Sequence, residues 1–158
     1  MATRQQIIDG VVTAIADGTD ISRNQIFVVA VPHFVTDGLP SIQYVEVIPG
    51  AQSNEQGNVG IGVAHFDFSV CVFTELFTDR LNDSIDRIVN ASQSLMNLIS
   101  ALDEALLNQT LGGILSGAIW PTGIDAAQDS PVENDGWVMQ RRSYACQFAF
   151  DYPAYGGN

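Results

Sequence analysis

The residues best suited to acid–base or nucleophilic chemistry are few, and their spacing matches no known catalytic arrangement. The chain has two histidines, His33 and His65. His65 and Asp67 are two residues apart in an alternating segment, so both point to one face of a predicted strand. A serine could complete a triad there, but the sequence has no G-x-S-x-G elbow to expose one. We predict no catalytic residue and no enzymatic activity.

Three ligand-binding motifs can be tested on the sequence, and each one fails. The glycines of residues 57–62 lead into a strand, whereas a phosphate loop opens a helix, and no lysine is present for a G-K-[ST] motif. The acidic segment 125–136 lacks the glycine and glutamate of a calcium loop. Cys71 and Cys146 lack zinc-ligand spacing. We expect no metal, no cofactor and two strand cysteines, with a disulfide as the alternative.

Charge and length limit the function classes further. The 158 residues carry six Lys and Arg against 18 Asp and Glu, a formal net charge of −12. Such a chain is unsuited to binding the DNA backbone or an anionic membrane. No apolar run approaches the roughly 20 residues of a membrane span, and residues 1–10 lack signal-peptide character. We expect a product of the cytosol that binds neither specifically to DNA nor to a membrane.

Hydrophobic periodicity predicts the elements that must position any functional surface. Thr3 and Gln6 form a capping box before a helix that ends near Gly18. After Thr78 the period changes to that of a helix, with a break expected at residues 100–103. Extended segments are predicted at 25–31, 41–48, 63–73 and 137–152, with an irregular edge strand in 114–124 and polar loops at 51–58 and 125–136.

This order of elements predicts an α+β fold. We expect one domain over residues 1–152, followed by a flexible tail at 153–158. Its core is a mixed, mostly antiparallel sheet of four to five strands with helices packed on one face. A sheet face without helices usually meets a partner.

The uncovered sheet face is the predicted contact surface. On the strand at 63–73, four polar or small residues alternate with the apolar ones: His65, Asp67, Ser69 and Cys71. Arg141 and Arg142 are the paired positive charges of the last strand and must point to opposite faces. Either arginine could anchor an acidic neighbour or guard a strand edge.

The element order then resembles a known family. A helix precedes a Pro-led strand beginning at Pro40; then come a polar segment, the alternating strand 63–73, helices after Thr78, and a closing strand that ends in Phe150, Asp151 and Tyr152. This arrangement looks like the tail terminator (tail-completion or minor tail) proteins of long-tailed bacteriophages. The resemblance covers nearly the whole chain and rests on patterning, because no short motif is diagnostic.

The resemblance implies a structural virion protein without cofactor or catalysis. Such proteins are similar in forming a hexameric ring that caps the head-proximal end of the tail tube, stops its polymerisation and receives the head-tail connector or neck proteins. The implied partners are copies of the chain, the tail tube protein and the connector, with DNA only passing through the lumen. The implied interface includes the polar segment: Gln52, Ser53, Asn54, Glu55, Gln56 and Asn58.

Two alternatives remain open from the sequence. A neck or head-completion protein, or a tail tube protein of the same virion, would share much of this pattern. A small acidic binding module or a DNA-mimic inhibitor would carry its acids on one strip, whereas here they are spread over the predicted elements.

Overall fold

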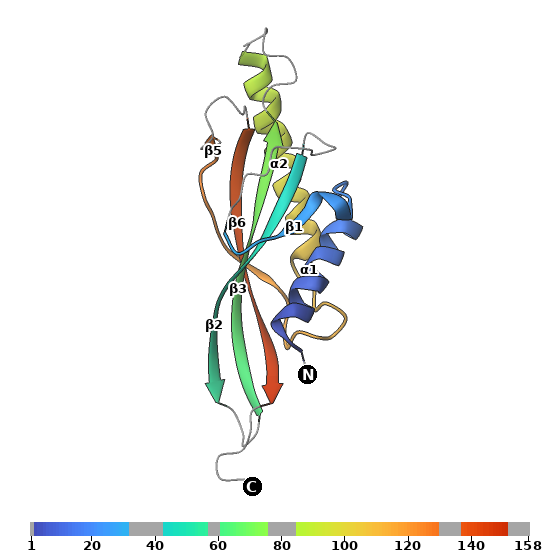
Figure 1. Ribbon diagram of the computed structural model, residues 1–158, viewed down its shortest axis with the longest axis vertical. Helices are drawn as coiled ribbons and strands as arrows, with labels where there is room; N and C mark the ends of the chain where they lie inside the picture. Colours follow the sequence, from blue (N-terminus) through green and yellow to red (C-terminus); the bar gives the residue numbers. More distant parts are fainter. Residues whose placement is uncertain (1, 32–42, 57–60, 76–84, 130–136, 152–158) are drawn as a thin grey trace.

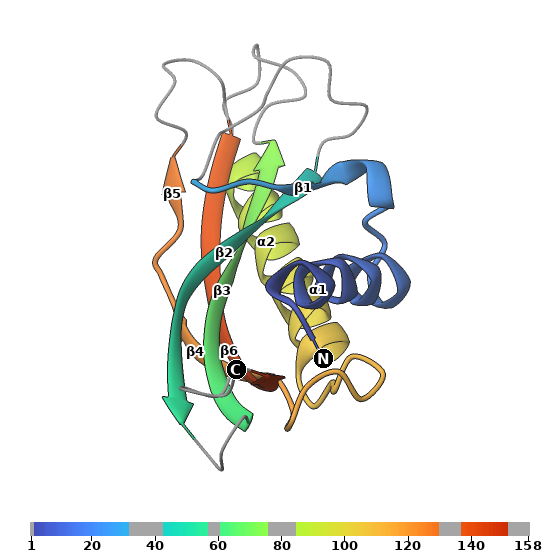
Figure 2. The same cartoon turned by 60° about the horizontal axis from the view of Figure 1, so that its bottom comes forward.

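The computed structural model describes residues 2–31, 43–56, 61–75, 85–129 and 137–151. Both helices lie on one side of a long twisted sheet (Figures 1 and 2). The elements in chain order are α1 (Arg4–Gly18), the 3-10 turn η1 (Arg23–Gln25), β1 (Ile26–Val28), β2 (Gln43–Gln56), β3 (Ile61–Glu75), α2 (Ile85–Leu106), β4 (Trp120–Ile124), β5 (Gln128–Asp129) and β6 (Trp137–Asp151).

The sheet has the strand order β1-β2-β3-β6-β4. The two-residue β5 pairs with the start of β6, and β4 pairs with the middle of β6. β1 runs parallel to β2, and the other pairs are antiparallel. The predicted α+β class, with a mixed and mostly antiparallel sheet, is confirmed.

The apolar face of β3 forms the centre of the core, as its alternation predicted. Four side chains on this face are at most 2% exposed: Phe66, Phe68, Val70 and Val72. The register places Val45 and Val47 of β2 beside them, and Tyr144, Cys146 and Phe148 of β6 on their other side. α1 and α2 cover this face with the buried stripes Ile7, Ile8, Val11, Val12, Ile15 and Leu95, Ile99, Leu102, Leu106.

The start of α1 follows the predicted capping box. The Gln6 amide donates to Thr3 Oγ1 at 3.2 Å, and the Thr3 amide donates to Gln6 Oε1 at 2.9 Å. The end of α1 lies at Gly18, as predicted, and the glycine there is required for packing. Gly18 is the last helical residue, and Thr19 closes the helix in an extended conformation by donating to Ile15 O. A Cβ on Gly18 would lie 2.6 Å from the Cβ of Ala105 on α2. Close helix packing therefore requires the glycine.

Gly18→Ala should lower the free energy of unfolding by about 1–3 kcal/mol, as overpacking does in dense cores. The sign is diagnostic, because alanine alone would favour a helix by about 1 kcal/mol. Urea unfolding measures the change. The double variant Gly18→Ala, Ala105→Gly should recover most of the loss; equal losses in the single and double variants would contradict this packing.

One predicted loop and one predicted helix break are absent from the structure. Residues 51–56 continue β2 because their backbone pairs with β3 from Gly62 to Phe66, beyond a bulge between Pro49 and Gln52. Residues 57–60, the rest of the predicted tip, lie outside the described residues. The break predicted at 100–103 is absent, since α2 runs unbroken to Leu106 and Asp103 is held by β6. The predicted start of this helix before Ile85 also lies outside the described residues.

The predicted irregular strand is present at the sheet edge. Residues 107–119 form turns first, with positive φ angles at Asn108 (65°), Leu111 (51°), Gly112 (72°) and Gly113 (88°). β4 then pairs with β6, with a bulge between Pro121 and Gly123. Of the second polar loop, residues 125–129 are described; residues 130–136 and the tail 153–158 lie outside the described residues.

Candidate assembly surface

The face of the sheet opposite the helices, here called the outer face, is divided into a covered and an open half. Next to Cys71, the side chains form a second buried cluster: Tyr44, Ile48, Phe73 and Met139, with Phe27 and Val29 packed against them. Tyr44 stacks on Phe73 with ring centroids 4.4 Å apart. The prediction of a wholly bare face is therefore wrong for this half.

The cover comes from the chain that follows β1. β1 pairs with only three residues of β2, and the Val29 amide then donates to Val47 O at 3.1 Å. In both views this segment, residues 27–31, crosses the sheet toward β5 (Figures 1 and 2). Phe27 meets Tyr44 edge-on at 5.8 Å. Cys71 is 0% exposed and Ser69 is 8% exposed as a result.

Beyond Ser69 the outer face is open, and its exposed side chains are polar. Asp67 is exposed, and His65 is half-buried between β2 and β6. His65 Nε2 lies 3.5 Å from Glu55 Oε2, and Gln147 Nε2 lies 3.0 Å from His65 Nδ1. These contacts join polar side chains of β2, β3 and β6 in a row across the outer face.

Trp120 adds an apolar anchor to this open half. It lies opposite Ala145 in the β4–β6 register, and Ala145 lies opposite Asp67 in the β3–β6 register. Residues directly opposite in a sheet share a face, so Trp120 belongs to the outer face. It is 38% exposed. We call His65, Asp67, Ala145, Gln147 and Trp120 the open patch.

The open patch continues into a groove of about 520 Å³. It is lined by Ser69 and Ser143, by the bulge of β2, and by Ala30 and Asp125. Arg141 lines it as well, and its Nε donates to Ser69 Oγ at 3.1 Å. Acids and one arginine together make this groove suited to polar contacts with protein.

The polar segment predicted at the interface is an exposed strand end. Gln52, Ser53, Asn54 and Glu55 are all exposed, and Gln52 Nε2 donates to Asn54 Oδ1 at 2.9 Å. For Gln56 the backbone pairs with Gly62, while its side chain lies outside the description, as does Asn58 entirely. The structure therefore brings Glu55 to His65 and leaves its neighbours open to solvent.

Arg141 and Arg142 point to opposite faces, as predicted, and have different partners. Arg142 lies on the helix face, where Nε and Nη2 donate to the two carboxylate oxygens of Asp103 at 3.0 and 3.1 Å. Tyr144 Oη donates to Asp103 Oδ1 at 2.8 Å. These bonds raise the pKa of Arg142, mainly through the Asp103 hydrogen bond. Arg142 is thus engaged within the subunit, and we leave it and the buried Cys71 out of the proposed surface.

The two cysteines are free and buried on opposite faces of the sheet. Burial raises the pKa of the Cys71 thiol to about 11 and that of the Cys146 thiol to about 12. Buried neutral thiols behave as small apolar side chains and are poor nucleophiles.

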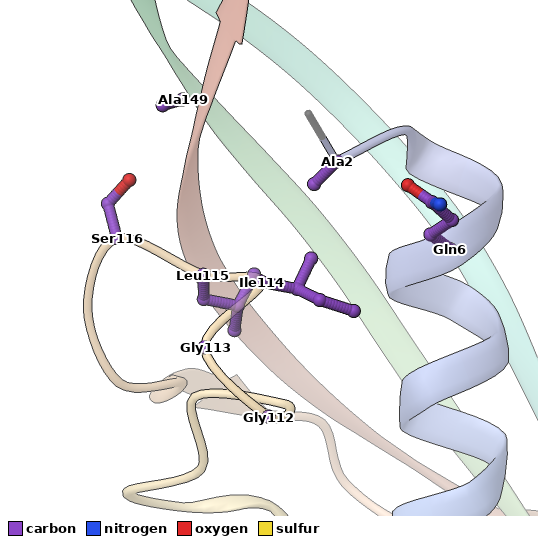
Figure 3. Close-up of a pocket in the computed structure, with 8 residues that line it drawn as sticks. All are labelled: Ala2, Gln6, Gly112, Gly113, Ile114, Leu115, Ser116 and Ala149. Carbon is purple, nitrogen blue, oxygen red and sulfur yellow. The ribbon is translucent and has the colours of Figure 1, made fainter.

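A second hollow is lined by small and apolar residues and a few polar ones. It has a volume of about 480 Å³ and lies between the start of α1 and the turn after Leu111 (Figure 3). Among the eight described residues that line it, Ser116 carries the one hydroxyl, and there is no acid or histidine. Across the described residues, no three His, Cys, Asp or Glu side chains gather in a way that could hold a metal ion. Neither described helix is long and apolar enough to cross a membrane.

No family model matches the chain, and no curated protein matches it. A solved structure is similar. It is a chain of the "Virion of native gene transfer agent (GTA) particle", 19% identical, with a TM-score of 0.49 over 92% of this chain and 90% of that one.

Sequence reasoning missed two parts of this surface. The crossing segment was assigned to a longer strand, because Gln25 to Val31 is continuously β-prone. Trp120 was placed in an irregular edge strand without a role. A usable signal was present, since a tryptophan followed by Pro121 in a segment without charges is typical of an exposed edge.

Proposed function

We propose that this chain is a structural protein of a virion, and specifically a tail terminator. In this proposal about six copies form a ring at the head-proximal end of the tail tube. The ring stops tube polymerisation and presents the surface to which the head connector attaches. The observation that carries the proposal is the open patch: an uncharged aromatic anchor, Trp120, beside polar groups on the half of the outer face that residues 27–31 leave open.

The composition of the open patch supports contact with protein over other ligands. Interfaces are enriched in tryptophan at their centres and have polar rims. The element order resembles the terminator family, in which docking is the whole activity. The net charge of −12 suits a ring through which DNA passes without adhering. The partners are copies of this chain, the tail tube protein and the connector proteins.

Purified protein tests the proposal directly. Native mass spectrometry should find a closed ring, and negative-stain images should show it end-on. A tube protein would instead form long cylinders, and a neck protein would assemble only with its head partner. A chain that stays monomeric at every concentration would refute the proposal.

Trp120→Ala should dissociate the ring. Removing a central aromatic anchor costs about 2 kcal/mol or more per interface, roughly a 30-fold weaker contact. The readout is the mass distribution as a function of concentration, with circular dichroism to show that the subunit stays folded.

Two variants control this test. Met96→Ala removes another exposed apolar side chain, 54% exposed on α2, and should leave the ring intact. Trp120→Phe should retain most of the assembly. If Trp120→Ala assembles as tightly as Met96→Ala, the open patch is not the contact surface.

A further inference from the structure

Two strand edges of the sheet are open in the described chain. β4 ends the strand order, pairs with β6 on one side, and is exposed at all five residues. On the opposite side of the sheet, β1 pairs with β2 only as far as Val47. In residues 51–56, here called the distal arm, Gln52 to Gln56 therefore pair with β3 alone among the described strands. Figure 1 shows this end of β2 at the margin of the sheet.

The two edges together contain one charged residue, so little charge opposes strand pairing. β4 consists of Trp, Pro, Thr, Gly and Ile, and the distal arm contains a single charge, Glu55. Natural proteins commonly protect open edges with lysine, proline or bulges. Here Pro121 and the adjacent bulge protect the start of β4 and leave residues 122–124 available. The Asp125 amide donates to Arg141 O at 3.0 Å, so the ladder alternation turns the N–H and C=O of Ile124 away from β6.

The directions of the two edges are compatible. β2 is antiparallel to β3, β3 to β6, and β6 to β4. β4 therefore runs opposite to β2. When copies are related by rotation around a ring, β4 of one copy meets the distal arm of the next in the antiparallel sense. Two short antiparallel segments can pair, because directly opposite residues exchange N–H···O=C hydrogen bonds.

We propose that residues 122–124 of one copy pair with the distal arm of the next copy, so that the sheet continues from subunit to subunit. This inference rests on the proposed ring and names the strands that join it. The occupant of each edge is a second copy, head to tail. A twofold pairing of two distal arms would instead place both Glu55 carboxylates on one short ladder, which is unfavourable in a chain this acidic.

Paired cysteines test the proposal on the full chain. Thr122→Cys is combined in turn with Gln52→Cys, Ser53→Cys or Asn54→Cys, so that three neighbouring registers between the copies are tested. Antiparallel partners have Cα atoms about 4.5–5.5 Å apart, within disulfide range. Cys71 and Cys146 are 0% exposed and do not compete. Mild oxidation should produce a non-reducing ladder ending at the ring mass, with at least a tenfold excess of linked over unlinked subunits in one of the three variants.

The outcomes separate this inference from the proposed function. The pair Thr122→Cys with Asn97→Cys, an exposed position on α2, is the matched control and should stay unlinked. Rings that form without linkage in any of the three variants overturn the edge pairing and leave the ring proposal standing. Dimers from Thr122→Cys alone show twofold pairing and overturn it as well. An unsubstituted chain that forms no ring overturns both.

Discussion

Asp103→Ala should cause the largest loss of stability among single surface-accessible substitutions. The carboxylate accepts from Arg142 Nε and Nη2 and from Tyr144 Oη. Its removal leaves the hydroxyl of Tyr144 and the guanidinium of Arg142 without this acceptor. Tyr144 is 0% exposed and the side chain of Arg142 is 15% exposed, so water cannot readily replace the carboxylate. Leaving such groups unsatisfied costs about 2–4 kcal/mol. Urea unfolding monitored by tryptophan fluorescence measures the change in free energy.

Two neighbouring substitutions make this test specific. Glu104→Ala removes an exposed carboxylate one residue along α2 and should change stability by less than about 0.5 kcal/mol. Asp103→Asn keeps an acceptor for Tyr144 but loses the ion pair, so its cost should lie between the two. Equal stability of Asp103→Ala and Glu104→Ala would show that the contacts of α2 with β6 do not depend on this carboxylate.

Asp103 also explains why part of the fold was predictable and part was not. The alternation of β3 predicted a buried face correctly, because each apolar residue at that spacing needs cover from the helices. The break at residues 100–103 was predicted because the helical period runs unusually far without caps. Asp103 is instead satisfied by two side chains about 40 positions later in the chain, a contact that no local pattern can show.

The candidate surface was predictable to the same limited extent. Asp67 and His65 were expected on an open face, and they lie there because period-two alternation fixes the face of each residue. Ser69 and Cys71 belong to the same alternation but are covered, since Phe27 and Val29 cross the sheet above them. The distal arm lacks apolar residues, so a loop was expected. Its strand form depends on backbone pairing with β3, which does not require buried side chains.

The free energy of unfolding should fall steeply once the pH exceeds about 9. Burial raises the pKa of Cys71 from 9.0 to about 11 and that of Cys146 from 9.0 to about 12. Burial and the hydrogen bond to Asp103 raise the pKa of Tyr144 far above 10.0 as well. In this window the unfolded chain has released these protons and the folded chain retains them. The contribution of these groups to the free energy of unfolding is thus fully present below their unfolded pKa values and is lost as the pH rises above them.

The slope of this alkaline loss can be calculated from proton linkage. Each group that is ionised only in the unfolded state lowers stability by about 1.4 kcal/mol per pH unit. The two thiols together approach about 3 kcal/mol per unit between pH 9.0 and about 11, and Tyr144 adds its share above 10.0. A loss of this size over two pH units is comparable to the whole stability of a typical domain. Urea unfolding at a series of pH values measures it.

A double variant assigns the first part of this loss to the thiols. Cys71→Ala with Cys146→Ala should be less stable at neutral pH by about 1 kcal/mol per site, because each substitution removes a buried sulfur. Its stability should nevertheless stay nearly constant from pH 9 to 10, where the unsubstituted chain already weakens, and fall above pH 10, where Tyr144 ionises in the unfolded chain but keeps its proton in the folded one. Parallel pH profiles for the two proteins would mean that the buried thiols do not control the alkaline transition. The cover that residues 27–31 place over Cys71 would then be looser than its complete burial implies.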